Sequence, residues 1–321
     1  MIKESLNLVT TKDGEQIAVW KIFDSIKESP AANNYTAKGQ NVLLAHGTFS
    51  DKRVCLGVAK YLAKLGHICY IMEWRGHGDS SIPKDKFDFE TVALYDLDAT
   101  FHYLFDGLKL DNLHCVTHSG GGICLTMYLT NRILTQELLA KNTQYIDKIN
   151  SISMFACQAY GAVLNPKSYA RILLIKSITR LLGYLPAKRL KLGTINESYQ
   201  TMTQWYDWNL NKNFKSSLAN KNFNAQNENT SDDGGFDYRQ HMPKITAPVY
   251  AISAKGDHFI APSSGCQLFL NDFNNPTNDF REFSISNGDL EDYSHSRIIM
   301  SRNASKEIWP TVAAWIEKHA T

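Results

Sequence analysis

Short apolar runs alternate with segments of helical periodicity along most of this chain, and this alternation constrains the fold more than any other feature. The predicted strands are residues 41–45, 67–74, 113–117, 150–157, 248–254 and 279–286, and the predicted helices are residues 53–64, 89–108, 119–133 and 304–319. Before them, residues 6–23 alternate around Asp13-Gly14, which predicts a β-hairpin. Strand–helix–strand units with short links fold by right-handed crossovers. We therefore expect an α/β protein with a mostly parallel central sheet flanked by helices.

One long segment interrupts the alternation. Residues 158–245 do not continue the alternation of predicted strands and helices, and the next predicted strand begins at Pro248. The interruption is better explained by an insertion than by a second domain. We expect a core made of residues 1–157 and 246–321, with a helical cap inserted at residues 158–245.

The composition excludes several classes of protein. A chain of 321 residues with 43% hydrophobic residues can bury a large core, and a formal net charge of +2 gives no argument for a nucleic-acid partner. The cysteines form no C-x-x-C pair, so we expect no metal site, and nothing implies an organic cofactor. The N-terminal residues lack the apolar region of a secretory signal peptide, and no apolar run approaches the length of about 18 residues that a membrane-spanning helix needs. We expect a soluble cytoplasmic protein.

The segment from Leu113 to Leu125 reads LHCVTHSGGGICL and predicts a strand, a sharp turn and a helix. Ser119 stands at the turn, and the small residues after it would let the helix pass close to the strand. This is the layout of a nucleophile elbow, which pushes one side chain into an open cleft. Gly121 fills the second glycine position of G-x-S-x-G, whereas Thr117 stands where the first glycine is usual.

A serine nucleophile needs a base, and the order of elements favours His295. This histidine lies between the last predicted strand and the last predicted helix. Asp257 ends the loop after the strand 248–254 and is the candidate acid that orients the histidine. The order Ser119, Asp257, His295 is that of one hydrolase architecture and differs from both common protease orders.

Other residues of the same types remain as rivals. The rival bases and acids are His118, His77, His258, Asp292 and Asp272. His118 is adjacent to the serine, so its side chain should point away from the serine hydroxyl. An aspartate in the loop after a strand often only forms a turn or caps a helix. A structural role of this kind is the alternative to a catalytic role for the candidate aspartates.

Acyl transfer also needs amides that stabilise an oxyanion. One donor would be the amide of Gly120, the residue after the serine. The other would come from the sequence HGTF after the strand 41–45, where the amide of Thr48 or Phe49 would face the cleft. His46 would brace this loop or line the substrate pocket.

Five segments together resemble the α/β-hydrolase superfamily, in particular its esterase, lipase and monoacylglycerol-lipase-like branch. They are LLAHGTFSD, WRGHGDS, THSGG, AKGDH and DYSHS, and the similarity runs from about residue 6 to residue 319. The chain departs from the usual pattern at Thr117 and at Ser294, which stands where a glycine frequently precedes the histidine. The resemblance implies an α/β-hydrolase fold and a serine hydrolase with no cofactor.

These residues predict an enzyme that hydrolyses carboxylic esters with an apolar acyl chain. Ser119 would be the nucleophile, His295 the general base and Asp257 its partner. Acyl transfer to a bound alcohol or thiol would use the same residues and is the first alternative. A non-catalytic binding protein on the same scaffold is the second, which the complete set of serine, aspartate and histidine disfavours.

Two features of the expected cap suit an apolar substrate. Residues 167–191 contain seven basic and no acidic residues, with leucines and isoleucines between them. This segment fits a cap helix with a solvated charged face, or a helix that rests on an anionic lipid surface. Trp205 and Trp208 would line an apolar acyl pocket, although packing in the core is an equal alternative.

Overall fold

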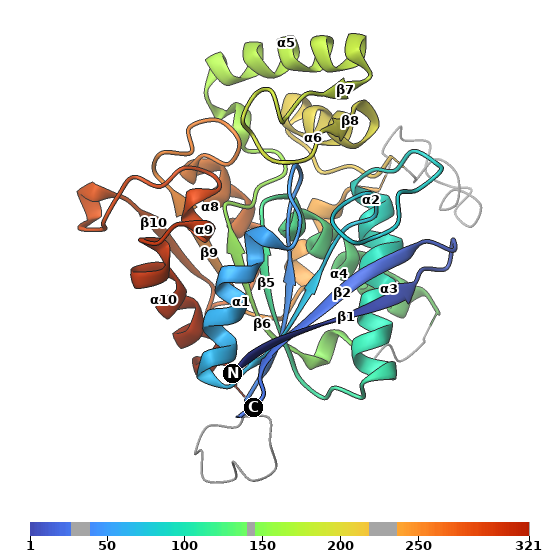
Figure 1. Ribbon diagram of the computed structural model, residues 1–321. Coiled ribbons are helices and arrows are strands. Elements are labelled where there is room, and N and C mark those ends of the chain that lie inside the picture. Colours follow the sequence, from blue (N-terminus) through green and yellow to red (C-terminus); the bar gives the residue numbers. More distant parts are fainter. Residues whose placement is uncertain (27–38, 140–144, 218–235, 321) are drawn as a thin grey trace.

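An eight-stranded sheet forms the centre of the computed structural model (Figure 1), which describes residues 1–26, 39–139, 145–217 and 236–320. The strands lie in the order β1-β2-β4-β3-β5-β6-β9-β10. Their bounds are β1 Ile2–Thr10, β2 Gln16–Asp24, β3 Asn41–Ala45, β4 Ile68–Met72, β5 Leu113–His118, β6 Ile149–Phe155, β9 Val249–Ala254 and β10 Asp279–Phe283. β1 and β2 form an antiparallel hairpin, β2 is antiparallel to β4, and all neighbours from β4 to β10 are parallel. The predicted α/β class, with its mostly parallel sheet, is confirmed.

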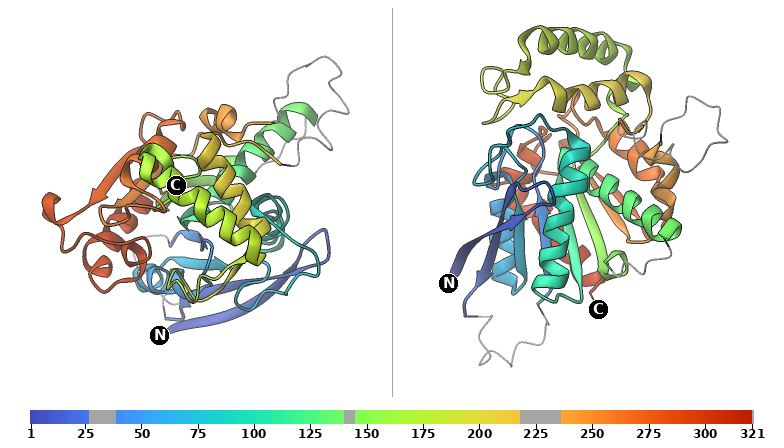
Figure 2. Two further views of the ribbon diagram at one scale, coloured as in Figure 1. Left: turned by 90° about the horizontal axis from the view of Figure 1, so that it is seen from above. Right: turned by 90° about the vertical axis from the view of Figure 1, so that its right-hand side faces the viewer.

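Helices cover both faces of this sheet (Figure 2). Their bounds are α1 Arg53–Leu65, α2 Phe89–Thr91, η2 Val92–Leu97, α3 Asp98–His102, η3 Tyr103–Gly107, α4 Gly120–Leu139, η4 Ile146–Lys148, α8 Ser263–Asn271, η7 Ile285–Asn287, α9 Arg297–Met300 and α10 Ala304–Lys318. α1, α9 and α10 pack together over one face, whereas α4 and the helical run 89–107 pack together over the other. The sheet core is therefore buried on both sides, as the apolar strands predict.

Several elements differ from their predicted bounds: β6 and β10 end early, β4 covers only Ile68–Met72 of the predicted 67–74, and α4 runs to Leu139 rather than to residue 133. β6 ends at Phe155 rather than 157 because Ala156 adopts a φ of +50°, which an extended strand cannot contain. β10 ends at Phe283 because Ser284 caps the turn η7 by accepting a hydrogen bond from the amide of Asn287. The sequence analysis missed α8, whose first turn reads Ser-Ser-Gly and carries no helical apolar pattern.

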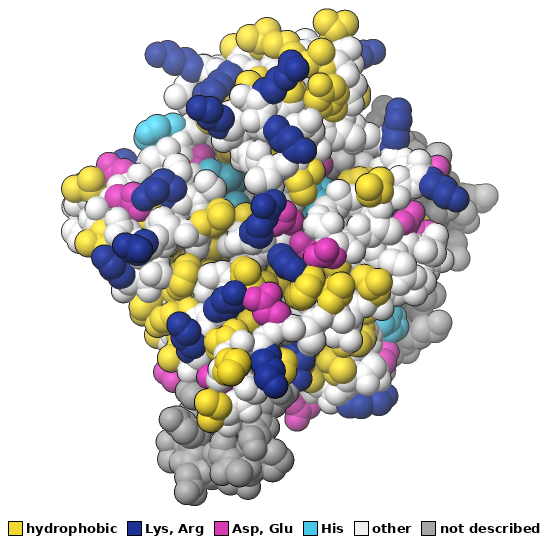
Figure 3. Space-filling view, in the orientation of Figure 1, with side chains coloured by type: hydrophobic (Ala, Val, Ile, Leu, Met, Phe, Trp, Pro, Cys, Tyr) yellow, Lys and Arg dark blue, Asp and Glu magenta, His cyan; other side chains and the backbone are white. Residues whose placement is uncertain are grey.

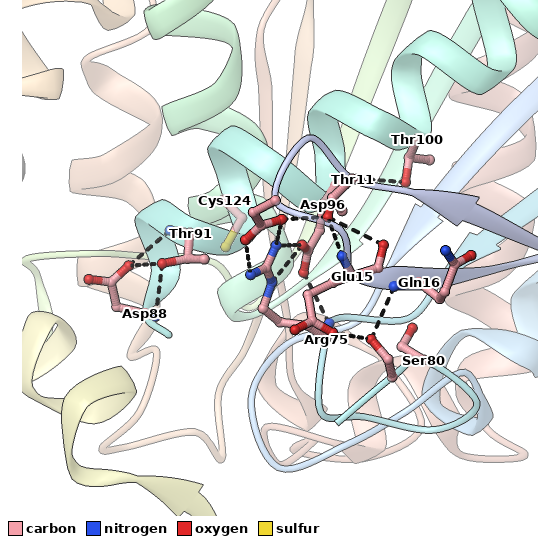
Figure 4. A network of polar contacts seen from close by, with 12 residues as sticks. Thr11, Glu15, Gln16, Arg75, Ser80, Asp88, Thr91, Asp96, Thr100 and Cys124 are labelled. Atoms are coloured by element: carbon pink, nitrogen blue, oxygen red, sulfur yellow. Dashed lines mark hydrogen bonds and ion pairs between the residues drawn. The ribbon is translucent and has the colours of Figure 1, made fainter. Parts of the chain in front are cut away.

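A buried arginine fixes the loop that follows β4 (Figure 4). The Nε of Arg75 donates to Asp96 Oδ1 at 2.8 Å, and its Nη1 donates to Asp13 Oδ2 at 2.7 Å. Asp96 belongs to η2, and Asp13 lies in the turn between β1 and β2. Charge-assisted bonds of this kind are geometrically specific, so Arg75 joins the hairpin, the loop and the helical run into one unit.

The segment between β6 and β9 folds over the carboxyl edge of the sheet. Its elements are η5 Ala162–Leu164, α5 Pro166–Leu182, β7 Tyr184–Leu185, β8 Glu197–Ser198, α6 Tyr199–Asn211 and η6 Tyr238–Lys244. α6 lies between the sheet and α5, and α5 is the outermost helix (Figure 1). Residues 218–235 of the expected cap lie outside the described residues, and the bounds 158 and 245 stay a prediction. We call residues 158–245 the inserted segment.

The six cysteines are all buried and form no disulfide with one another. In the parts of the chain that the structure describes, no helix is long and apolar enough to cross a bilayer. The same residues contain no group of three His, Cys, Asp or Glu side chains that could hold a metal ion.

Candidate active site

Ser119 occupies a strained turn between β5 and α4. Its φ is +53°, a left-handed conformation that is unusual for a residue with a side chain. Its amide donates to the carbonyl of Phe155 at 2.9 Å, which ties the turn to the neighbouring strand. A Cβ on Gly121 would lie 2.4 Å from the carbonyl oxygen of Ala45, so only glycine lets α4 pass this close to β3. The sharp strand-to-helix turn predicted from the sequence is present.

Thr117 fits in this turn because Gly122 leaves room opposite its side chain. A Cβ on Gly122 would lie 2.9 Å from Thr117 Oγ1 and 2.5 Å from Cys157 Sγ. The Thr117 hydroxyl donates to the carbonyl of Ser153 at 3.4 Å, so it is not left unsatisfied by burial. The departure from G-x-S-x-G at Thr117 is thus accommodated without moving Ser119.

Side chains from two other loops meet at Ser119. His295 lies between β10 and α9, and its Nε2 is 2.9 Å from Ser119 Oγ. Its Nδ1 is 2.5 Å from Oδ2 of Asp257, which follows β9. A carboxylate only accepts hydrogen bonds, so the proton sits on Nδ1 and Nε2 is left as an acceptor for the serine hydroxyl. The three residues predicted from separate loops therefore form one continuous hydrogen-bonded chain.

Asp257 is held as a carboxylate by several groups. The amides of Ile260 and Ala261 donate to its Oδ1 and Oδ2 at 3.0 and 3.1 Å. Burial alone would raise the pKa of Asp257, but the charge and hydrogen bond of His295, together with these two amides, lower it below its ordinary value. Asp257 therefore stays charged where it can fix the histidine tautomer.

The rival acids have other partners. Asp292 is exposed, and its Oδ1 accepts a hydrogen bond from the amide of Ile285 at 2.9 Å. Asp272 forms an ion pair with Arg239 at 2.7 Å. Asp292 therefore stabilises a local turn, whereas Asp272 joins the end of α8 to the inserted segment.

The rival histidines are also engaged elsewhere. The ring of His118 points to the histidine loop, where its Nε2 donates to the carbonyl of His295 at 2.9 Å. His77 is paired with Glu197, and His258 is exposed. His118 thus supports the position of His295 through its backbone, and only His295 of the described histidines bonds to Ser119.

The amides of Thr48 and Gly120 lie beside the serine. Both residues line the same pocket as Ser119, and a Cβ on Gly120 would lie 3.4 Å from the amide nitrogen of Thr48. α4 begins at Gly120, so the positive end of its dipole also favours a negative charge here. The amide of Phe49, the other predicted donor, instead donates to Glu197 Oε1 at 2.9 Å. Of the two predicted alternatives we therefore retain Thr48, because the amide of Phe49 is occupied.

Glu197 is a candidate functional residue that the sequence analysis missed. It is 1% exposed, and its Oε1 accepts hydrogen bonds from the amide of Phe49 and, at 2.8 Å, from His77 Nε2. The amides of Thr194 and Ile195 donate to the carbonyl of Phe49 at 2.8 and 3.1 Å. Phe49 has a φ of +66°. The inserted segment therefore holds both backbone polar groups of a strained residue next to Thr48.

An apolar pocket of about 430 Å³ opens beside the serine. Thr48, Ser119, Gly120 and Arg171 are among the polar or glycine residues of its lining. Its apolar wall includes Phe89, Ile123, Ile175, Leu185, Met202 and Trp205. This volume lies in the range of about 300–1,000 Å³ that small-molecule sites occupy.

Only one of the two predicted pocket tryptophans lines this wall. Trp205 does so, whereas Trp208 packs edge-on against Phe89 with ring centroids 5.5 Å apart. The indole N–H of Trp208 donates to the carbonyl of Lys215 at 2.8 Å, away from the pocket. The assignment of Trp208 to the pocket is therefore wrong: a buried indole needs a partner for its N–H, and here that partner is the backbone carbonyl of Lys215 in the loop after α6.

His46 braces the loop before Thr48 and does not line the pocket, which corrects its assignment there. Its Nε2 accepts a hydrogen bond from the amide of Trp74 at 3.1 Å, and its Nδ1 donates to the carbonyl of Gly47 at 2.7 Å. Burial is the main cause that lowers the pKa of His46 to about 3. The neutral ring can therefore join the ends of β3 and β4 at any ordinary pH.

Comparison with known families gives a match over most of the chain. The family model described as α/β hydrolase fold matches residues 40–284. The chain belongs to the α/β-hydrolase fold family. None of the curated proteins matches the sequence of this α/β hydrolase.

Solved structures share its fold at low sequence identity. The esterase Pf2001 of Pyrococcus furiosus is 16% identical with a TM-score of 0.60, and the match covers 100% of this chain and 92% of that one. The mouse α/β hydrolase domain-containing protein 10 is 14% identical with a TM-score of 0.62, over 98% and 99%. The esterase EaEST of Exiguobacterium antarcticum is 15% identical with a TM-score of 0.59, over 97% and 99%. These likenesses extend the shared fold over nearly the whole of this α/β hydrolase.

We expect this α/β hydrolase to lose stability in mild acid because three buried histidines are held neutral. Burial lowers the pKa of His46 and His118 to about 3 and that of His114 to about 4. In the unfolded chain each would titrate near about 6.5, so below that pH the unfolded state binds more protons and the free energy of unfolding falls. Each histidine contributes a loss of about 1.4 kcal/mol per pH unit between about pH 6.5 and its folded pKa.

Urea unfolding at about pH 7.5 and about pH 5 measures this loss. For His77, burial would lower the pKa, but the charge and hydrogen bond of Glu197 outweigh burial and raise it, so this histidine opposes the trend. The His114→Asn variant should lose less stability between the two pH values than the wild type, because one linked proton is gone. Equal free energies of unfolding for the wild type at both pH values would contradict the assignment of neutral buried rings.

Proposed function

We propose that this protein hydrolyses carboxylic esters that carry an apolar acyl chain. The observation that carries the proposal is the position of Ser119 in the lining of a mostly apolar pocket, with its hydroxyl oxygen 2.9 Å from His295 Nε2. An ester bound with its acyl chain in this pocket would present its carbonyl carbon to the serine. Several structural neighbours, among them the proteins from Pyrococcus furiosus and Exiguobacterium antarcticum, are described as esterases, which supports the same class of reaction.

In the proposed reaction the Ser119 oxygen bonds to the carbonyl carbon while its proton passes to His295 Nε2. Asp257 holds Nδ1–H and stabilises the imidazolium that forms. The carbonyl oxygen becomes an oxyanion, to which the amides of Thr48 and Gly120 donate. Loss of one such donor costs about 3–4 kcal/mol of barrier.

Collapse of this intermediate breaks the bond to the alcohol, which takes the proton from His295 and leaves. Water then attacks the acyl-enzyme, again with His295 as the base, and releases the carboxylic acid and the free serine. The strained backbone conformation of Ser119, with its φ of +53°, keeps the serine side chain facing the pocket through both steps.

A panel of p-nitrophenyl esters from acetyl to palmitoyl tests this proposal. We expect kcat/KM to rise from acetyl to a medium chain, because added methylenes enter the apolar pocket, and the Ser119→Ala variant to be inactive. Products analysed with and without an added alcohol distinguish hydrolysis from acyl transfer. Absence of turnover on every ester would contradict the proposal. If the main product were a new ester of the added alcohol, the protein would be an acyltransferase rather than a hydrolase.

The Trp205→Ala variant should shift the preferred acyl chain to a longer one. Trp205 lines the pocket, so its truncation lengthens or widens the space available to the chain. Trp208→Ala is the matched control from the same helix, since Trp208 packs in the core. The ratio of kcat/KM for long and medium esters should change in the Trp205 variant and stay near the wild-type ratio in the Trp208 variant, even if the latter is less stable. The opposite pattern would place the acyl chain elsewhere.

A further inference from the structure

The outer face of α5 is an exposed apolar stripe. Leu181 is 87% exposed, Leu174 is 61% exposed and Leu173 is 43% exposed. Successive residues of an α-helix are about 100° apart around its axis. On this spacing the outermost arc of α5 consists of Ala170, Leu173, Leu174, Ser177 and Leu181. The buried side chains of the helix, Ser168, Ile172 and Thr179, lie on the opposite side.

Basic side chains flank this stripe on both sides. Lys176 and Arg180 fall along one margin, and Lys167 and Arg171 fall along the other, by the same helical spacing. Figure 3 shows dark blue and yellow side chains together over this end of the molecule, with no magenta over α5. An apolar stripe between two cationic margins is the pattern of a helix that lies in the interface of a membrane.

The positive charge of this face is nearly uncompensated. Three further basic residues of the segment, Lys188, Arg189 and Lys191, are exposed beside α5. Within the described residues only Lys176 of the seven forms an ion pair, with Asp207. The nearby Glu197 is buried against His77 and adds no surface charge.

The pocket borders this face along one flank of α5. Leu174 and Ile178 of α5 and Leu190 and Leu192 of the following loop line the pocket, and all four are also exposed to solvent. An apolar surface in contact with α5 would therefore also contact side chains that line the pocket of Ser119.

We propose that this face, comprising α5 and residues 184–192, docks on the surface of an anionic lipid bilayer. Anionic lipids complement its positive charge, and leucines on a protruding helix can enter the boundary between headgroups and acyl chains. A second copy of the chain is a poorer occupant, because a symmetric contact through this face would place the cationic margins of both copies together. The proposal does not depend on ester hydrolysis, since the docking face lies outside the serine, histidine and aspartate cluster.

Sedimentation with lipid vesicles tests the proposal, with the Ser119→Ala protein so that turnover plays no part. We expect binding to vesicles of phosphatidylcholine mixed with phosphatidylglycerol, weak or no binding to phosphatidylcholine alone, and weaker binding as salt is raised. The Lys167→Glu, Arg180→Glu double variant should bind the anionic vesicles at least about tenfold more weakly, because both side chains are in the cationic margins and neither lines the pocket. Leu181→Asp should also weaken binding by about tenfold or more.

The matched control is Lys306→Glu, Lys318→Glu, which reverses two exposed cations on α10. This control should bind the anionic vesicles as the parent does. In an otherwise wild-type background, both double variants should hydrolyse a water-soluble ester at the wild-type rate, which shows that the site is intact. Equal binding to neutral and anionic vesicles, unchanged binding by the α5 variant, or a soluble dimer that Leu181→Asp dissociates would overturn the proposal.

Discussion

Replacing Asp257 by asparagine should lower kcat for ester hydrolysis by about 10⁴-fold while the protein stays folded. The carboxylate now accepts Nδ1–H of His295 at 2.5 Å and leaves Nε2 free to accept the serine proton. An asparagine amide that donates toward Nδ1 would favour the opposite tautomer, with the proton on Nε2. The base would then be unavailable even though every heavy atom keeps its place.

Asp292→Asn is the matched control for this experiment. Asp292 is one of the two rival acids of the sequence analysis, but it is exposed and accepts a hydrogen bond from the amide of Ile285. We expect its kcat to stay within about twofold of the wild type, since surface substitutions away from special features change little. Steady-state kinetics and a circular dichroism spectrum of both variants decide the matter. A large loss in Asp292→Asn with little change in Asp257→Asn would show that the acid is assigned wrongly.

Replacing Glu197 by alanine should lower kcat by about 10- to 100-fold with little change in KM, because a misplaced oxyanion donor weakens binding of the transition state more than that of the substrate. The hydrogen bonds of Glu197 go to Phe49 and His77 rather than to the serine, so it is a positioning residue. It holds the amide of Phe49 next to Thr48, and alanine would release that strained residue. Glu197→Gln should recover most of the loss, because the amide oxygen can still accept from Phe49 and His77.

Glu90 provides a control for the loss of a buried carboxylate. It is fully buried and its oxygens accept hydrogen bonds from Tyr238 and Gln204 at 2.8 and 2.9 Å. Glu90→Ala should lower the free energy of unfolding by an amount similar to Glu197→Ala, about 1–3 kcal/mol for the polar groups left unpaired. Its kcat at a temperature where both variants are folded should stay closer to the wild type. Equal losses of kcat in the two variants would mean that Glu197 acts through stability alone.

The alternation of strands and helices was sufficient to predict that Ser119, Asp257 and His295 lie close together. Ser119, Asp257 and His295 each follow a predicted strand, and parallel strands bring their carboxyl ends to one edge of a sheet. The prediction needed only local signals, such as the small residues after Ser119 and the loop after β9. That prediction did not require the register of the strands, the direction of the side chains or the exact residue at which each strand ends.

Contacts across long stretches of sequence could not be predicted in this way. Glu197 bonds to the amide of Phe49 across 148 positions, and nothing in the residues around Glu197 indicates that partner. Trp205 and Trp208 share one helix and one residue type, yet only the tertiary packing assigns one to the pocket and the other to the core. Such assignments depend on how the inserted segment sits on the sheet, which no local periodicity encodes.

Labelling with a fluorophosphonate tests the central claim most directly, because the reagent captures a serine only when a base and an oxyanion site activate it. We predict that the native wild-type protein gains one phosphonyl group, that peptide mapping places it on Ser119, and that Ser119→Ala and the heat-unfolded protein gain none. A native wild-type protein that remains unlabelled, or labelling that persists in Ser119→Ala, would contradict the account.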